Sequence, residues 1–334
     1  MSKRIFCFVL GAMLFALCQS AEAQQPAKIP RVGYISGEGD PNNPGPSTAA
    51  FRHGLRELGY VEGKNIQVDY RYILGQSGRI AGLVVELIQL KPDVLVTASL
   101  ASTRAAKQQT KTIPIVFRIP DDPVLLGLVE SLARPGGNIT GVASLGRELS
   151  GKRLELLLEA IPTIKRVGLL YSPTGVLTAA ALSRRNIEDY EIPAQGLKIA
   201  VNSVLLRNIN QEIENAVREL TKAGAKALVV INTTPLYPFR AKIADLAIKN
   251  RVPLLAEEGN WAEAGALMSY ATNEQESYRR VAVHVDKILK GTKPGDLPVE
   301  QPTKFEFVIN LKTAKALNLT IPQSVLFRAD KVIK

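Results

Sequence analysis

The stretch that decides the fold is Arg31-Val-Gly-Tyr-Ile-Ser36, because a close copy of it, Arg166-Val-Gly-Leu-Leu-Tyr-Ser172, begins 135 residues later. Each copy is a short apolar run that ends in small polar residues, which is typical of a buried strand entering a loop. One such match could arise by chance. The segments that follow each copy therefore decide whether the chain contains an internal repeat.

Three further pairs of apolar segments follow in the same order. They are 66–70 with 199–204, 93–99 with 227–233, and 113–117 with 252–256. The offset stays between 133 and 139 residues, so we interpret the chain as two copies of one pattern. Amphipathic helices separate the apolar strands in both copies. This alternation predicts parallel sheets that are covered by helices on both faces.

We therefore predict an α/β protein with two similar doubly wound parallel-sheet lobes joined by a multi-strand hinge. Ligands of such sheets bind outside the carboxyl ends of the strands, so two facing lobes would enclose a ligand between them. The predicted lobes are 29–142 plus 268–297 for the N-terminal lobe, and 147–266 plus 300–325 for the C-terminal lobe.

Other segments give the expected connections. The first link between the lobes runs through 142–146, and we expect a long helix over 273–290 and a late strand over 305–311 to cross back. Asp122-Pro123 has the form of a helix start, and Arg134-Pro-Gly-Gly137 that of a helix stop, so these residues predict a helix between them.

The first residues have the order of a secretory signal peptide. Lys3 and Arg4 precede an uncharged, largely apolar run over 5–18, and Ala21-Glu22-Ala23 supplies a small-x-small cleavage pattern. The apolar run is too short to span a bilayer. We expect cleavage of residues 1–23 after Ala23 and a protein that is exported to the periplasm, is not membrane-spanning and is a monomer.

Cysteine content and charge restrict the partners further. Both cysteines, Cys7 and Cys18, lie in the predicted leader, so the exported chain has no disulfide and no thiolate ligand or nucleophile. Without the leader, the formal net charge of +11 falls to about +10. The basic residues are scattered and not interleaved with aromatic ones, which, together with export, argues against nucleic acid as a partner.

Motifs of catalysis are missing, so we expect neither an enzyme nor a cofactor or metal site. Gly37-Glu-Gly39 follows the first strand, but Asn42 stands where a dinucleotide fingerprint requires glycine or alanine. His53 and His284 each lie in a predicted amphipathic helix without a carboxylate in metal-ligand spacing. A structural or surface role is therefore expected for both. An exported hydrolase would need a nucleophile with a base in reach.

Polar loops at the strand ends of the first copy supply candidate ligand contacts. They are Ser36, Gly37, Ser99, Ser102, Thr103 and Asp121. A helix N-terminus such as that near Ser99 attracts a carboxylate, but Ser99 or Ser102 could equally cap the helix. Asp122 is expected to be a cap rather than a ligand contact.

The second copy supplies the matching loops. They contain Tyr171, Ser172, Asn232, Thr233, Thr234, Glu257 and Trp261. Tyr171 and Trp261 are candidates for apolar or stacking walls, although Trp261 could instead pack a short helix.

Several runs carry a resemblance to a known family. Asp122-Pro-Val-Leu-Leu-Gly-Leu-Val129, followed by Ser131-Leu-Ala-Arg-Pro-Gly-Gly-Asn-Ile-Thr-Gly141, resembles the signature of ABC-transporter substrate-binding proteins of the tryptophan-binding-protein-like group. Phe51-Arg-His-Gly-Leu-Arg-Glu-Leu-Gly-Tyr60, Gly265-Ala-Leu-Met268 and Asn318-Leu-Thr-Ile-Pro-Gln-Ser-Val-Leu326 fit the same group. The resemblance implies the periplasmic binding protein type I fold. It also implies delivery of ligand to an ABC permease driven by a separate ATPase subunit.

The resemblance also bears on the ligand. Members that bind aromatic amino acids use the loops matching 98–103, 171–172 and 232–234, and favour an Asp-Asn pair where this chain has Thr233-Thr234-Pro235. The ligand class is therefore a small carboxylate or amino-acid-like solute, and our hypothesis is a carboxylate without an amino group. The alternative function is a periplasmic sensor that presents the same ligand to a membrane receptor.

Overall fold

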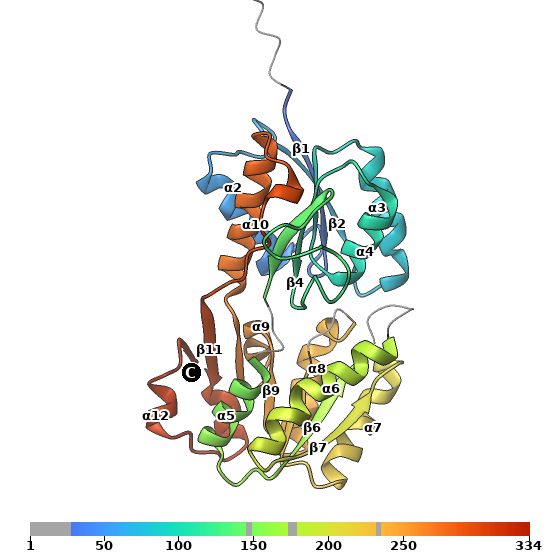
Figure 1. Cartoon of the computed structure of the whole chain (residues 1–334). Coiled ribbons are helices and arrows are strands. Elements are labelled where there is room, and N and C mark those ends of the chain that lie inside the picture. Colours follow the sequence, from blue (N-terminus) through green and yellow to red (C-terminus); the bar gives the residue numbers. More distant parts are fainter. Residues whose placement is uncertain (1–27, 145–148, 173–178, 232–234) are drawn as a thin grey trace, which may run out of the picture.

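The computed structural model describes residues 28–144, 149–172, 179–231 and 235–334, with only the backbone described over 179–186. The chain forms two lobes, each with a sheet between layers of helices (Figure 1). The predicted fold class is confirmed. The predicted signal peptide, 1–23, lies outside the described residues.

The N-terminal lobe is built on a five-stranded parallel sheet of order β2-β1-β3-β4-β5. Its strands are β1 Arg31–Ser36, β2 Gln67–Tyr72, β3 Val94–Thr97, β4 Ile115–Ile119 and β5 Ile139–Ala143. Its helices from the first half of the chain are α2 Gly45–Glu57, η2 Ser77–Arg79, α3 Ile80–Gln89 and α4 Leu100–Gln109. The apolar side chains of α3 and α4 pack on one face of the sheet, and those of α2 pack on the other.

The C-terminal lobe is built on a seven-stranded sheet of order β12-β11-β10-β9-β8-β6-β7, in which only β10 and β11 pair antiparallel among the described strands. Its strands are β6 Arg166–Tyr171, β7 Ala200–Leu205, β8 Ala227–Val230, β9 Leu254–Ala256, β10 Met268–Thr272, β11 Phe305–Asn310 and β12 Lys331–Ile333. Its helices are α5 Ser150–Ala160, α6 Ala179–Gly196, α7 Ile209–Lys222, η4 Tyr237–Phe239, α8 Arg240–Lys249, α9 Gly259–Glu263, α11 Leu311–Ala316 and α12 Gln323–Leu326.

The internal repeat is visible in the packing of its first strands. A Cβ atom on Gly33 of β1 would lie 2.9 Å from a methyl carbon of Leu95, and one on Gly168 of β6 would lie 3.0 Å from a methyl carbon of Leu228. The two leucines occupy equivalent places on the neighbouring strands β3 and β8. A side chain at this point of either copy would therefore meet the same close leucine contact.

Helix α10, Glu274–Leu289, returns the chain to the N-terminal lobe, where it packs beside α2 and against β4 and β5. The sequence placed 268–272 in the N-terminal lobe as well, but this strand, β10, pairs with β9 and β11 of the C-terminal sheet. The chain thus crosses between lobes one strand later than expected, at Asn273. The predicted helix over 273–290 and strand over 305–311 are confirmed by α10 and β11. The short helix η5, Pro294–Asp296, then packs on β5.

The helix predicted after Asp122 is wrong. Residues 122–130 form successive turns instead, and Gly127 has φ +66°, which a right-handed helix cannot contain. The carboxylate of Asp122 accepts hydrogen bonds from the backbone N–H groups of Val124 and Leu125, at 2.8 and 3.2 Å. The capping role expected for Asp122 is therefore present, although it caps a turn.

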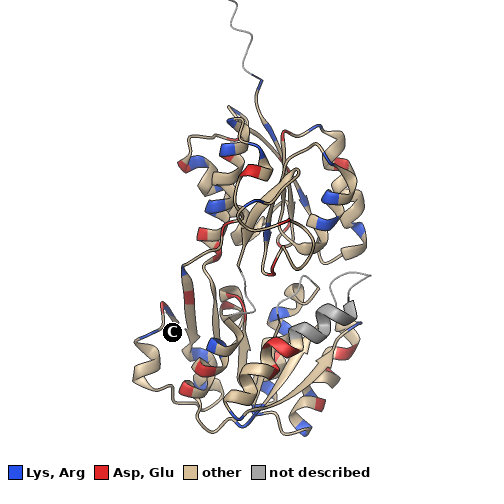
Figure 2. Ribbon diagram, in the orientation of Figure 1, with Lys and Arg blue, Asp and Glu red and all other residues tan. Residues whose placement is uncertain are grey.

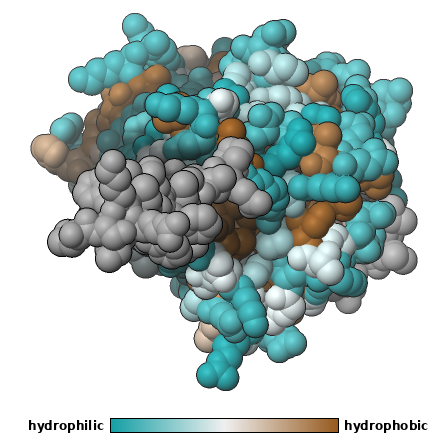
Figure 3. Space-filling view, turned by 90° about the horizontal axis from the view of Figure 1, so that it is seen from above, coloured by the Kyte–Doolittle hydropathy of each residue, from teal (hydrophilic) through white to brown (hydrophobic). Residues whose placement is uncertain are grey.

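The exposed face of the N-terminal lobe is mainly hydrophilic, with hydrophobic residues in small separate areas (Figure 3), and basic and acidic residues occur on both lobes (Figure 2). Among the residues that the structure describes, no helix has the length and apolar character needed to cross a membrane.

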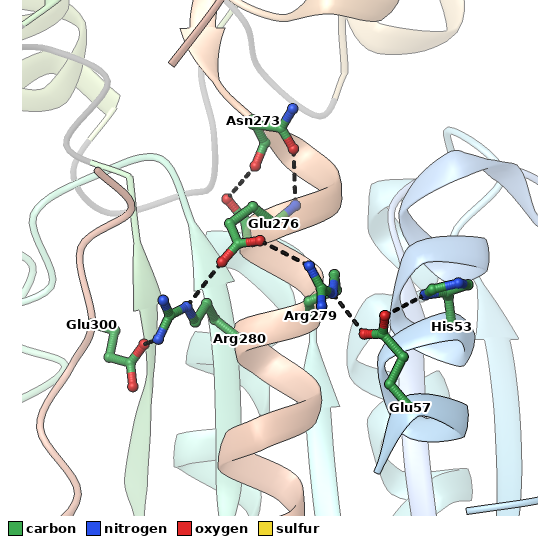
Figure 4. A network of polar contacts seen from close by, with 8 residues as sticks. His53, Glu57, Asn273, Glu276, Arg279, Arg280 and Glu300 are labelled. Atoms are coloured by element: carbon green, nitrogen blue, oxygen red, sulfur yellow. Dashed lines mark hydrogen bonds and ion pairs between the residues drawn. The ribbon is translucent and has the colours of Figure 1, made fainter. Parts of the chain in front are cut away.

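Ion pairs attach α10 to α2 (Figure 4). Glu57 of α2 accepts a 2.7 Å hydrogen bond from Arg279 and lies 3.5 Å from a ring nitrogen of His53, whose side chain is exposed. His284 of α10 is buried, and its ring nitrogens lie 3.0 and 3.1 Å from the carbonyl oxygens of Arg280 and Pro298. The surface and structural roles predicted for the two histidines agree with these positions.

Candidate functional site

The carboxyl ends of the parallel strands in the two sheets face each other across the lobe boundary (Figure 1). The loop after β1 contacts the segment after β8 directly, since the hydroxyl of Tyr237 donates a 2.6 Å hydrogen bond to Glu38. Ligands of open α/β sheets bind at this edge of the sheet. The facing edges are therefore the candidate ligand site.

Ser36 and Gly37 shape the loop after β1. The buried hydroxyl of Ser36 donates to the carbonyl oxygen of Glu38 at 2.6 Å and accepts from the N–H of Glu38 at 3.2 Å. Gly37 is half-buried, and a Cβ atom there would lie at an ordinary 3.7 Å from the carbonyl oxygen of Ala98. The described contacts of Ser36 thus hold Glu38 in place.

Ser99, Ser102 and Thr103 form the start of α4. Ser99 is the N-cap, and its hydroxyl accepts a 3.2 Å hydrogen bond from the N–H of Ser102. Thr103 donates its hydroxyl to the carbonyl oxygen of Ser99 at 2.7 Å, and the two serine hydroxyls lie 2.8 Å apart. Ser99 therefore caps the helix, as the alternative interpretation expected. Contact between these residues and a ligand stays a prediction.

The remaining predicted residues fall in different surroundings. Asp121 is half-buried after β4, and Tyr171 and Ser172 are buried at the end of β6. Trp261 is fully buried in the core of the C-terminal lobe, which favours the packing alternative over a stacking wall. The predicted contacts at Asn232, Thr233 and Thr234 lie outside the described residues.

Glu257 holds a buried cation. Its Oε1 accepts hydrogen bonds from Arg153 of α5 at 3.1 Å and from the hydroxyl of Tyr190 of α6 at 2.7 Å. Arg153 also donates to the carbonyl oxygen of Tyr270 at 2.8 Å, and its side chain is only 2% exposed. Glu257 therefore links α5, α6 and the loop after β9, as a structural anchor of the C-terminal lobe beside the facing edges.

Sequence reasoning missed Arg118, which lies at the centre of the inter-lobe contact. Arg118 comes from β4 of the N-terminal lobe and forms ion pairs with Glu258, which follows β9, and with Glu274, which begins α10. The Arg118 to Glu258 distance is 4.0 Å, and the Arg118 side chain is 7% exposed. Its Nε is buried without a hydrogen-bond partner among the described residues. The sequence signal was a charged residue in the apolar strand Ile115–Ile119.

A second group of missed residues adjoins the first. Besides accepting from Tyr237, the carboxylate of Glu38 accepts a 2.6 Å hydrogen bond from the N–H of Ser47 in α2. The amide of Asn260 donates to the hydroxyl of Tyr237 at 3.1 Å. Residues from both lobes therefore form one polar group that has contacts across the boundary.

The environment of Glu258 is poor in positive charge. The pKa of Glu258 is raised to about 7, first by burial and then by the negative charges of Glu38 and Glu257, against the lowering effect of Arg118. Arg118 therefore compensates the carboxylates only in part. The described residues contain no group of histidine, cysteine and acidic side chains arranged to hold a metal ion. Buried charges and hydroxyl groups from both lobes at one boundary are suited to holding a polar solute.

Two facing α/β lobes with buried charges at their boundary define a ligand-binding protein. The chain belongs to the family of ABC transporter substrate binding proteins, whose model matches residues 46–333. Members of this family bind ligands rather than catalyse reactions.

Relatives and solved structures agree with the family. The chain is 26% identical over 277 residues to the "Tyrosine-binding protein" of Clostridioides difficile, covering 80% of this chain and 75% of that protein. A conserved domain protein of Vibrio cholerae has a similar structure, with a TM-score of 0.81 and 27% identity over 91% of this chain and 100% of that one. A Streptococcus pneumoniae ABC domain solved with L-Trp has a TM-score of 0.80 and 24% identity, covering 91% and 99%.

Substitution of Glu257 by Gln is expected to destabilise the protein, because it removes the carboxylate beside a buried guanidinium. The expected loss is about 3 kcal/mol in the free energy of unfolding, measured by urea denaturation. The control is Glu155→Gln, since Glu155 is half exposed and pairs with the exposed Lys152. That change is expected to cost less than about 1 kcal/mol. Equal losses in the two variants would contradict the anchoring role of Glu257.

Glu258 is expected to make stability fall as pH rises. Its pKa is near 7 in the folded chain and near 4.5 in the unfolded one, so the folded chain binds the proton more tightly between these values. Glu258→Gln removes this titration. Relative to the wild type, the variant should gain on the order of 3 kcal/mol in the free energy of unfolding between pH 4.5 and 8. Urea denaturation across this range measures it, and a pH-independent difference would refute the assignment.

Proposed function

We propose that this protein is the periplasmic receptor of an ABC importer and captures an amino-acid-like solute between its lobes. The observation that carries the proposal is the set of carboxylates around Arg118, which comes from both lobes and from the start of α10. A solute with an ammonium group supplies the positive charge that this set lacks. The proposal replaces our hypothesis of a carboxylate without an amino group.

Charge balance is the first step of the argument. Glu258 and Glu274 form ion pairs with Arg118, and the pKa of Glu258 is raised by burial and by the negative charges of Glu38 and Glu257. The other guanidinium that interacts with Glu258, that of Arg153, is already paired with Glu257. An ammonium ion close to a buried carboxylate is attracted strongly because little solvent screens the pair. Binding of a cationic group would therefore ionise Glu258 and join the two lobes.

The second step concerns the other end of the solute. The facing edge of the N-terminal lobe presents the first turn of α4, which Ser99 caps. Helix N-termini favour negative charge, so this turn is the natural neighbour of a ligand carboxylate. An α-amino acid carries both charges on adjacent atoms and would satisfy both lobes at once.

Closure of the lobes would complete the site. The hydrogen bond from Tyr237 to Glu38 crosses the boundary. The closed arrangement therefore fixes the carboxylate of Glu38, which would lie beside the proposed ligand. A ligand that contacts both lobes shifts the population towards this closed form. The closed form is the one that we expect the permease to recognise.

The cellular setting follows from the leader. Residues 1–23 support export and cleavage after Ala23, which would release the receptor into the periplasm. Membership of the substrate-binding family supports a membrane permease with a separate ATPase subunit as the partner. A sensor would use the same site and a different membrane partner, so import is tested by uptake of the ligand in cells that lack this protein.

Calorimetry with matched ligands tests the solute class. Each amino acid is compared with its desamino acid, which keeps the carboxylate, and with its decarboxylated amine, using the chain from residue 24 onward. The amino acid that binds best should bind at least tenfold more tightly than either relative. Glu258→Gln should weaken it by about tenfold or more, because a charge-assisted hydrogen bond contributes about 1.5–3 kcal/mol. Glu155→Gln serves as the control and should leave the affinity unchanged.

A desamino acid that binds as tightly as its amino acid would contradict the role of the carboxylates. Failure of every amino acid, amine and carboxylic acid to bind would contradict the proposed solute class altogether.

A further inference from the structure

The amino ends of the parallel strands in the C-terminal lobe carry a group of exposed cations, which we call the basic edge. It consists of Lys165, Arg166, Lys198, Lys226 and Arg251. Arg166 begins β6 and Lys165 directly precedes it, while the other three precede β7, β8 and β9. These four strands are neighbours in the order β7-β6-β8-β9, so the five residues share one edge of the sheet.

The internal repeat provides a matched comparison in the N-terminal lobe. Lys226 N–H donates to Arg166 at 2.9 Å, just as Asp93 N–H donates to Arg31 at 2.7 Å, so Lys226 occupies the place of Asp93. By the same backbone correspondence, the residues that match the basic edge are Pro30, Arg31, Asn65, Asp93 and Thr112. Five positively charged positions in one lobe thus match one positive and one negative position in the other.

Arg31 and Arg166 are the one matching pair of positions that carries a positive charge in both lobes, and their contacts differ. Arg31 forms a 2.6 Å ion pair with Asp69 on the neighbouring strand. At the equivalent place, Arg166 lies 3.5 Å from the neutral amide oxygen of Asn202. Asp93 further accepts a 2.6 Å hydrogen bond from Lys28. The N-terminal lobe therefore pairs Arg31 with an acidic side chain, whereas Arg166 has no acidic partner among the described residues.

Acidic residues of the covering helices do not compensate the basic edge. Glu159, at the end of α5, pairs with Arg328, and Asp245 of α8 pairs with Lys249. Glu219 of α7 lies one turn from Lys222. Among the described residues, Lys165, Lys198 and Lys226 form no ion pair. Figure 2 shows basic residues at this end of the lobe, away from the inter-lobe boundary.

The geometry of the basic edge indicates the kind of partner. Neighbouring strands lie about 4.8 Å apart, so the four strand ends place their charges along roughly 15 Å. The residues flanking the five cations are not aromatic, which leaves no stacking platform for nucleic-acid bases. Several separate positive charges along one exposed edge suit a flat surface of phosphate groups. Each charge near such a surface adds its own attraction to the binding.

We propose that the basic edge binds the anionic phospholipid head groups of a membrane surface. The ligand-binding boundary lies at the opposite end of the same sheet and stays free in this arrangement. The attachment is peripheral and electrostatic, so it is reversible and weakened by salt. The inference is independent of which solute the protein binds.

Vesicle sedimentation tests the proposal, using the chain from residue 24 onward and vesicles of phosphatidylcholine with or without one third phosphatidylglycerol. The test variant is K165Q/K198Q/K226Q. The control is K64Q/K91Q/K111Q, which removes three exposed charges from the matching edge of the N-terminal lobe. Each cation near an anionic surface changes the affinity about fivefold, so the test variant should bind on the order of 100-fold more weakly. The control should lose about fivefold or less.

The wild type should bind the anionic vesicles, release at 0.5 M salt and ignore the neutral vesicles. Charge-preserving K165R/K198R/K226R should bind like the wild type. Circular dichroism and thermal melting verify that each variant is folded. Equal losses in the test variant and the control would show attraction by net charge alone and overturn the proposal. Absence of binding to anionic vesicles would also overturn the proposal. The same conclusion would hold if the basic edge bound an acidic protein but no vesicles.

Discussion

The structure depends on a buried guanidinium at the boundary of its two lobes. Arg118 is buried in a strand that is otherwise apolar. A buried charge of this kind is stable only beside opposite charges. The carboxylates that accompany it come from the loop after β9 and from the start of α10. The positions of the lobes and the electrostatics of the boundary are therefore coupled, and a change in one alters the other.

The internal repeat explains why the lobes are alike in their frames and different in their surfaces. Gly33 and Gly168 both pack closely against a leucine of the neighbouring strand, so a larger side chain at either place would have to displace that leucine. No such constraint acts at the exposed strand ends, where Asp93 in one copy corresponds to Lys226 in the other. Buried positions of the repeat define the fold, and exposed positions are free to acquire separate roles.

The sequence predicted the frame well because apolar periodicity is a local property. The matched segments placed the strands β1 to β4 and β6 to β9 correctly, and the residues after the second copy placed α10 and β11. Met268 to Thr272 was placed in the wrong lobe, because its apolar pattern fits either sheet and its partners β9 and β11 are chosen by tertiary contacts. The helix expected after Asp122 failed for a local reason, the positive φ of Gly127.

The candidate site was harder to predict, since charges that matter there lie far apart in the sequence. Glu257 was selected by its place after a strand, yet its partner Arg153 comes from a helix 104 residues earlier. Arg118 and Glu258 are joined only when the lobes are together. Trp261 looked like a ligand wall by residue type and proved to be core, because burial is decided by the neighbouring elements.

We propose that ligand draws the two lobes together across this charged boundary. The predicted exported chain lacks cysteine, so spin labels can be placed on Leu125→Cys and Ile192→Cys, which replace exposed residues of opposite lobes. Pulsed electron paramagnetic resonance then measures the inter-lobe distance without ligand and with the amino acid that binds best. We expect a shorter and narrower distance distribution with ligand, and a loss of that shift in Arg118→Gln. An unchanged distribution at saturating ligand would contradict it.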